Sequence, residues 1–121
     1  MDAAGKGAED IACRSGAREI MPFEASELAV PSVQTDNPDV KITRWDFAPG
    51  AATGWHTHGW PYIIVMLTDA KMRLHDGTNI TEVDLKAGDA YQRPAGVAHD
   101  VMNGSDKPMA FVEIEVKRPL L

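Results

Sequence analysis

The segment GDAYQRPAGVAHDVMN, residues 88–103, decides which fold this chain can adopt. It predicts two short strands joined by a bend, with Gly88, Pro94 and Gly96 as the residues that form the turns. Glycine admits positive φ angles and proline fixes a bend, so this arrangement delivers His99 to a defined place on the second strand. These three residues are therefore expected to shape the backbone and to take no part in chemistry.

Most of the chain outside this segment has the hydrophobic patterning of β-strands. A continuous apolar run at residues 61–67 is typical of a buried strand, and Asp76-Gly77 is a strong hairpin signal between two alternating stretches. The predicted strands lie at residues 41–47, 61–67, 71–75, 79–85, 90–93, 100–103 and 109–117. Many short strands separated by Gly and Pro turns favour an antiparallel, all-β domain, and we predict a jelly-roll β-barrel.

The first part of the chain is organised differently. Residues 1–19 are small and polar and are expected to form a loose N-terminal arm, followed by one barrel domain at residues 20–121. A short helical turn is expected around residues 23–28, ended by Pro31. There is no long helical pattern and no internal repeat in the sequence.

Composition excludes several classes of partner. The chain has 121 residues, 44% of them hydrophobic, and a formal net charge of −6. No run of Lys or Arg suggests binding to nucleic acid or to a membrane surface, and no apolar run is long enough to span a bilayer. Cys13 is the single cysteine, which excludes an internal disulfide and fits a reducing compartment. The expected location is the cytoplasm.

Three histidines have the spacing of a metal site. His56 and His58 are two residues apart, so in a strand both side chains point to the same face. Together with His99 they would offer three imidazoles to one ion and leave open coordination positions, which a catalytic ion needs. The alternative is that all three are satisfied by hydrogen bonds alone. His75, beside the Asp76-Gly77 turn, is expected to be an exposed loop residue and no ligand.

These residues resemble the two sequence motifs of the cupins, small β-barrels that usually bind a metal. The second cupin motif matches at Gly88, Pro94, Gly96, His99 and Asn103, and the first at Gly50, His56 and His58. Asn103 is expected to tie down backbone. Tyr62 stands where the first motif has a glutamate ligand, so the resemblance implies a site of three histidines with one negative charge less than usual.

The resemblance has two further implications. The string Arg44–His56 is similar to a cupin subgroup labelled β-alanine degradation proteins. Small single-domain cupins commonly pair, so the resemblance also implies a homodimer.

Tyr62 has three interpretations, which the sequence leaves open. Its hydroxyl could orient a bound water, dioxygen or substrate oxygen, it could pack in the core, or it could ligate the ion as a phenolate. We favour the first and expect Tyr62 to be catalytic.

Four further residues are expected near a substrate pocket: Trp60, Gln92, Arg93 and Phe111. Because Gln92 and Arg93 are adjacent on a strand, only one of them can face inward. An inward arginine could bind a substrate carboxylate through two parallel hydrogen bonds. The alternative is that Arg93 points to solvent or pairs with an acid.

The leading hypothesis is a small metal-dependent enzyme that oxidises or cleaves an oxo or carboxylic acid metabolite with dioxygen. Its expected native ion is Fe²⁺, while purified protein is expected to accept Ni²⁺, Zn²⁺ or Mn²⁺ as well. Two alternatives stay open: a metal-dependent isomerase, decarboxylase or lyase without redox change, and a ligand-binding cupin without catalysis.

Overall fold

The computed structural model describes residues 23–119, which form nine β-strands and contain no helix. Over these residues there is accordingly no helix able to cross a membrane. The strands are β1 (Val30–Asp36), β2 (Val40–Phe47), β3 (His56–Thr57), β4 (Tyr62–Met66), β5 (Ala70–His75), β6 (Ile80–Leu85), β7 (Ala90–Arg93), β8 (Ala98–Asn103) and β9 (Met109–Val116). The prediction of an all-β fold is confirmed. The arm expected at residues 1–19 lies outside the described residues.

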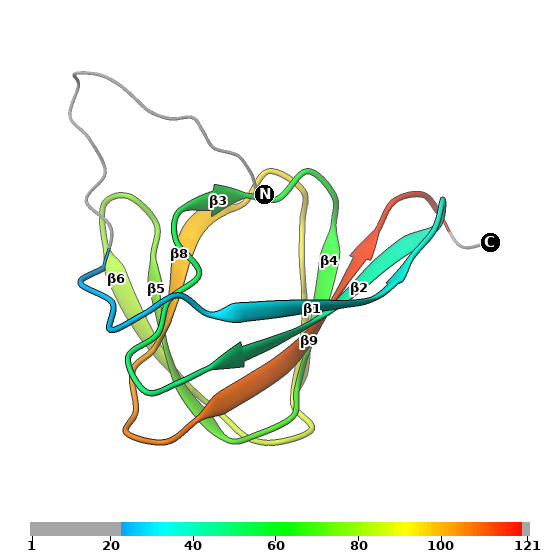
Figure 1. The fold of residues 1–121 in the computed structure, drawn as a ribbon. Helices are drawn as coiled ribbons and strands as arrows, with labels where there is room; N and C mark the ends of the chain where they lie inside the picture. Colours follow the sequence, from blue (N-terminus) through cyan, green and yellow to red (C-terminus); the bar gives the residue numbers. More distant parts are fainter. Residues whose placement is uncertain (1–22, 120–121) are drawn as a thin grey trace.

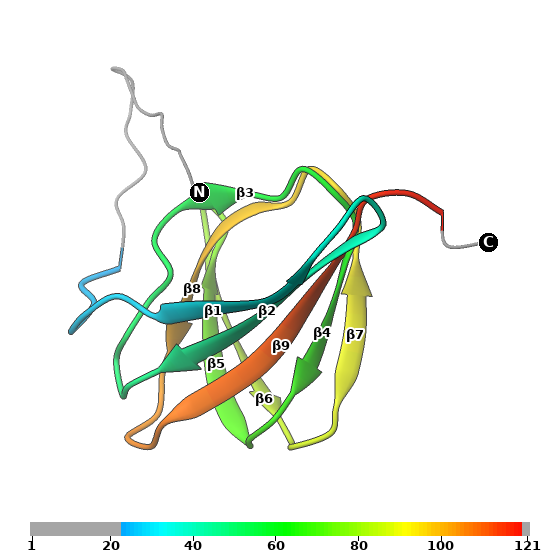
Figure 2. The ribbon, with the colours of Figure 1, turned by 45° about the vertical axis from the view of Figure 1, so that its right-hand side comes forward.

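The strands are arranged in two antiparallel sheets (Figures 1 and 2). One sheet has the order β1-β2-β9-β4-β7, and the other has the order β3-β8-β5-β6. From β3 to β9 the chain passes repeatedly from one sheet to the other, which is the winding of a jelly roll. No strand pair joins the two sheets within residues 23–119, so the barrel predicted from the sequence is an open one.

The inner face of the five-stranded sheet changes from apolar to polar along β9. Met109 and Phe111 are buried at the apolar end, and the next inward positions hold Glu113 and Glu115. Directly paired residues share a face of the sheet, and β2 follows the same gradient. The inward pairs are Phe47 with Met109, Trp45 with Phe111, Thr43 with Glu113, and Lys41 with Glu115. The apolar end can therefore form a core while the polar end remains available for a site.

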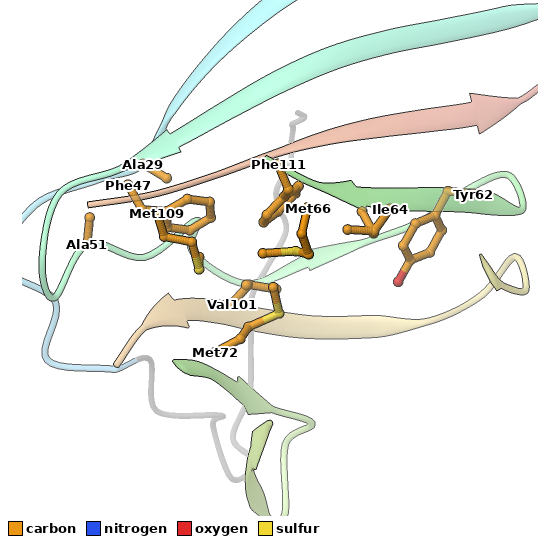
Figure 3. Packing of buried hydrophobic residues seen from close by; sticks show 10 residues of the cluster. All are labelled: Ala29, Phe47, Ala51, Tyr62, Ile64, Met66, Met72, Val101, Met109 and Phe111. Atoms are coloured by element: carbon orange, nitrogen blue, oxygen red, sulfur yellow. The ribbon is translucent and has the colours of Figure 1, made fainter. Parts of the chain in front are cut away.

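The core fills the apolar end between the two sheets (Figure 3). Its buried members are Ala29, Phe47, Ala51, Tyr62, Ile64, Met66, Met72, Val101, Met109 and Phe111. The rings of Phe47 and Phe111 lie 5.4 Å apart between centroids. Burying a side chain of this size contributes about 1.5–3 kcal/mol to stability. Tyr62 is the member at the polar end, so it joins the core to the polar region.

The outer face of the same sheet has an aliphatic patch. Ile42, Ile114 and Ile63 form one row across three strands, and Val112 and Val65 form part of the next row. All five are partly exposed, and they alternate with side chains that point into the barrel.

Two details of the N-terminal part differ from the sequence prediction. The helical turn expected at residues 23–28 is wrong, because Leu28 forms a parallel bridge with Ala52 instead. Strand β1 was not predicted, since its residues are exposed and lack a buried apolar face. It exists because its backbone pairs with β2 at the sheet edge, with a shift of register between Val33 and Thr35.

Asn103 fastens three chain segments together at the end of β8. Its side chain is completely buried and its amide group donates to the carbonyl oxygens of Phe47, Ala48 and Lys107, at 3.4, 3.3 and 2.7 Å. Its carbonyl oxygen accepts from the backbone N–H and the hydroxyl of Ser105, at 3.0 and 3.1 Å. The expectation that Asn103 ties down backbone is confirmed.

Replacing Asn103 tests how much this network contributes. Asn103→Ala leaves the buried backbone partners without their hydrogen bonds, and we expect the free energy of unfolding to fall by about 2–4 kcal/mol. Urea denaturation of the metal-free protein measures the change. The matched control is Asn79→Ala in the exposed turn before β6, with an expected effect within about 0.5 kcal/mol. An equal fall in the free energy of unfolding in both variants would contradict a stabilising role of the Asn103 hydrogen bonds.

Candidate metal centre

The three predicted histidines meet where β3 pairs with β8. His56 lies directly opposite His99, so their side chains share one face of the sheet. The backbone of His58 donates to Val97 O and accepts from Gly96 N–H, both at 2.8 Å. Gly96 has a φ of +95°, which side-chain-bearing residues rarely adopt, so glycine is needed where the chain turns back toward His58.

The ring nitrogens of the triad converge on one point. The Nε2 atom of His58 lies 3.1 Å from Nε2 of His56 and 3.1 Å from Nε2 of His99. Two nitrogens that each lie about 2.0–2.1 Å from one ion, at tetrahedral or octahedral angles, are about 2.9–3.4 Å apart. The spacing of the triad therefore fits a shared divalent ion. In residues 23–119 these histidines form the one cluster of potential metal ligands of this kind.

Hydrogen bonding alone does not satisfy the triad. Nδ1 of His56 lies 2.9 Å from Gly54 O, which can only accept, so this nitrogen carries the proton and Nε2 of His56 is bare. A single proton on Nε2 of His58 could then serve His56 or His99 but not both. One of the two close contacts would then have no hydrogen bond. If all three Nε2 atoms are unprotonated, their lone pairs can be directed at one cation, and no close contact lacks a partner. The arrangement therefore favours metal binding over the hydrogen-bonded alternative.

The surroundings keep the imidazoles neutral. Burial lowers the pKa of His56 below its ordinary value. Burial and the neighbouring histidines lower the pKa of His58 to about 3 and that of His99 to about 2. Neutral imidazole is the form that binds metal, so all three side chains are ready to act as ligands at neutral pH.

A buried acid that sequence reasoning missed supports the loop before His56. Asp100 is 1% exposed, and its Oδ1 accepts from Gly54 N–H at 3.1 Å. Gly54, with a φ of +89°, then presents its carbonyl oxygen to the His56 ring. Asp100 thus orients His56 through one backbone unit. The available signal was an acidic residue directly after His99 in a strand that the pattern already predicted.

Tyr62 packs against the triad from β4. It is 2% exposed, and its ring stacks on that of His58, with 3.8 Å between centroids and 20° between planes. Burial raises the pKa of the Tyr62 hydroxyl, so the phenol stays protonated, which disfavours the interpretation as a phenolate ligand. No group within residues 23–119 forms a hydrogen bond with this hydroxyl. It is therefore available to a bound molecule.

Glu113 of β9 is a second buried acid that the sequence analysis did not single out. One carboxylate oxygen accepts from Trp45 Nε1 at 3.3 Å, and the other lies 3.6 Å from Nδ1 of His58. Burial and the charge of Glu115 raise the pKa of Glu113 to about 7. The alternation of β9 could have identified it, because a glutamate in register with Phe111 must face the barrel interior.

The structure does not bring the four expected pocket residues together. Phe111 lies in the core beside Phe47. Trp60 and Gln92 line a cavity of about 420 Å³ at the start of β4, where the Lys117 ammonium lies 5.3 Å from the centre of the Trp60 ring. Neither His56, His58 nor His99 lines this cavity.

Of the two neighbouring residues Gln92 and Arg93, it is Arg93 that faces inward. It lies directly opposite Tyr62, whereas Gln92 lies opposite Ile63 of the outer face. Its side chain is exposed, and its charge helps to lower the pKa values of His58 and His99. Arg93 therefore combines solvent access with an electrostatic effect on the triad.

His75 does not belong to the triad, as predicted. The expectation that it is an exposed loop residue is wrong, because it is the last residue of β5 and only partly exposed. Its Nδ1 accepts from Gly77 N–H at 2.9 Å, and its ring has edge contacts with Phe23 and Trp55.

Substitution of one ligand tests the site. Purified wild-type chain is expected to bind about one divalent ion per chain, and His99→Ala should lose it because two imidazoles hold an ion far more weakly than three. Elemental analysis after dialysis measures the metal, and circular dichroism verifies the β fold. His75→Ala is the matched control and should keep the ion. Full metal content in His99→Ala would remove His99 from the ligand set.

Comparison with known proteins places this site in a family. Residues 43–115 match the family model described as the cupin domain. The β-alanine degradation protein BauB of Pseudomonas aeruginosa is 49% identical over 89 residues, which cover 74% of this chain and 94% of that protein. A crystal structure of a cupin domain from Bordetella pertussis has a TM-score of 0.74 and 43% identity, and the match covers 76% of this chain and 96% of that one.

More distant structures share the fold. A protein from Klebsiella pneumoniae with a double-stranded β-helix domain has a TM-score of 0.64 at 21% identity, covering 86% of this chain and 91% of that one. The family match contains His56, His58 and His99, as well as β3, β8 and most of both sheets. The resemblance noted in the sequence is confirmed, and the chain belongs to the cupin family.

Proposed function

We propose that this chain is a metal-dependent enzyme that uses dioxygen to oxidise or cleave a small oxo or carboxylic acid. The observation that carries the proposal is the convergence of three Nε2 atoms beside a protonated tyrosine without a hydrogen-bond partner in residues 23–119. Three neutral ligands leave coordination positions for other molecules, and a structural site would fill them with protein groups.

Arg93 supports the choice of an acidic substrate. It lies on the inner face of β7 opposite Tyr62, and it is accessible to solvent. A guanidinium in this place can bind a carboxylate through two parallel hydrogen bonds while the rest of the substrate reaches the triad. The name of the Pseudomonas relative, a β-alanine degradation protein, agrees with a small carboxylic acid.

Each group has a defined task in this proposal. The three histidines hold the ion, which we propose to be Fe²⁺, and bound iron would supply the redox chemistry and polarise the substrate oxygens. Arg93 binds and orients the carboxylate. The Tyr62 hydroxyl donates a hydrogen bond to an oxygen that gains negative charge during the reaction. The stack on His58 holds the Tyr62 ring in place, so this donor is already oriented.

The test uses oxygen uptake by the Fe²⁺-loaded chain with a panel of small oxo and carboxylic acids. We expect uptake in the presence of iron and one class of acid. Tyr62→Phe should keep the metal and lower kcat by about 100- to 1000-fold, because loss of one such donor has an effect of this size. Phenylalanine preserves the stack on His58, so metal content serves as the control.

Other outcomes would favour the alternative functions. Turnover that proceeds without oxygen and with Zn²⁺ would overturn the oxidative proposal in favour of an isomerase, decarboxylase or lyase. Tight binding of an acid without turnover by any loaded form would favour a ligand-binding cupin. Unchanged kcat in Tyr62→Phe would assign Tyr62 to packing.

We also propose that two copies of the chain pair through the aliphatic outer face of the five-stranded sheet. None of Ile42, Ile114, Ile63, Val112 and Val65 is charged, and Arg44, which lies opposite Val112 at the margin of this patch, is paired with Asp46. Each copy carries a net charge of −6, so copies repel each other elsewhere and approach most readily where the surface is apolar. A face that meets its own copy about a twofold axis is self-complementary, which suits a flat row of like residues.

Charge placed at the centre of this face should separate the copies. Ile114→Glu is expected to shift the molar mass from twice 13.2 kDa to 13.2 kDa, because dimerisation would bury an unpaired carboxylate in each copy. Light scattering coupled to size exclusion measures the mass. Ile80→Glu, at an exposed position of β6 in the other sheet, is the control. A dimer that persists in Ile114→Glu would show that another surface is used.

A further inference from the structure

Glu113 is a buried acid that lies beside His58 of the triad. Its side chain is 11% exposed and lies on the inner face of β9, between Thr43 of β2 and Ile64 of β4. A buried carboxylate is costly unless hydrogen bonds and a positive charge compensate it. Within residues 23–119, its side-chain contacts with N–H groups are those with Trp45 and His58. The buried carboxylate of Glu113 therefore faces a histidine of the triad.

The chemistry of a ligating imidazole explains what such an acid can do. An imidazole that offers Nε2 to an ion carries its proton on Nδ1, and that N–H needs an acceptor. For His56 the acceptor is Gly54 O at 2.9 Å. For His58 the facing group is the Glu113 carboxylate, at 3.6 Å. This separation is slightly longer than a hydrogen bond, and a small rotation of the glutamate side chain closes it.

We propose that Glu113 is a positioning residue of the metal centre, whose carboxyl oxygen accepts a hydrogen bond from Nδ1–H of His58. This inference rests on the metal site of the proposed function and is independent of the reaction. Glu113 acts on the ion through His58, so it fixes the tautomer and the orientation of that ring and raises the basicity of Nε2.

Trp45 completes the arrangement. Its indole N–H can only donate, and it holds one oxygen of Glu113 at 3.3 Å. The other oxygen is thereby turned toward His58. Trp45 has no contact of its own with the triad among the hydrogen bonds and ring contacts of the described residues, so its effect on the ion should pass through Glu113.

Metal affinity tests the proposal without any enzyme assay. The metal-free chain is titrated with Zn²⁺ in competition with a chelator, and Co²⁺ absorption reports the ligand geometry. Glu113→Gln should weaken Zn²⁺ binding by about 10- to 100-fold and change the Co²⁺ spectrum. Glutamine has one carbonyl oxygen for two N–H donors and carries no charge. Glu82→Gln, at an exposed position of β6 in the other sheet, is the control and should bind like the wild type.

A second variant separates positioning from general destabilisation. Trp45→Phe should weaken Zn²⁺ binding less than Glu113→Gln does, and it should cause no further loss when it is added to Glu113→Gln. Thermal melts of the metal-free variants verify that each one folds. If Glu113→Gln does not fold, wild-type affinity in Trp45→Phe overturns the proposal and a loss supports it.

The failures can be told apart. Wild-type Zn²⁺ affinity and an unchanged Co²⁺ spectrum in folded Glu113→Gln would overturn the role of Glu113 and leave the metal site standing. A wild-type chain that binds neither Zn²⁺ nor Co²⁺ would overturn the metal site and this inference together.

Discussion

The pairing of His56 with His99 across β3 and β8 is the constraint on which the site depends. Side chains alternate along a strand, so a slip of one residue in this register would send one of the two imidazoles to the opposite face. The register is held by the backbone contacts of His58 with Val97 and Gly96 and, away from the site, by the Asn103 network at the far end of β8. Residues that never approach an ion thus determine whether the three rings meet.

The polarity gradient along β9 reconciles a stable core with a polar site in one small barrel. Phe111 and Met109 occupy inward positions at one end, and the same face continues with two glutamates. A single strand therefore contributes apolar contacts to the core and an acid to the surroundings of His58. Tyr62 has the same double character on β4, since it is a core residue whose ring lies on a histidine.

Much of the fold and the triad could be predicted from the sequence, because both follow from short-range periodicity. The spacing of His56 and His58 sets a common face, and alternating apolar residues predict most strands. Strand β1 escaped prediction because its exposed residues leave no hydrophobic pattern. Glu113 escaped because burial is by default assigned to the aliphatic face of β9, although Phe111 on the opposite face gave the signal that Glu113 points inward.

Strand β3 has only two residues and lies at the edge of its sheet, with β8 as its single neighbour. Elements with few pairs open far more often than core strands do, without unfolding of the rest of the domain. The segment with two of the three histidines can therefore detach from β8 while the core between the sheets stays packed. We expect ions to be exchanged through such local opening, so the lifetime of a bound ion is decoupled from the global stability of the barrel.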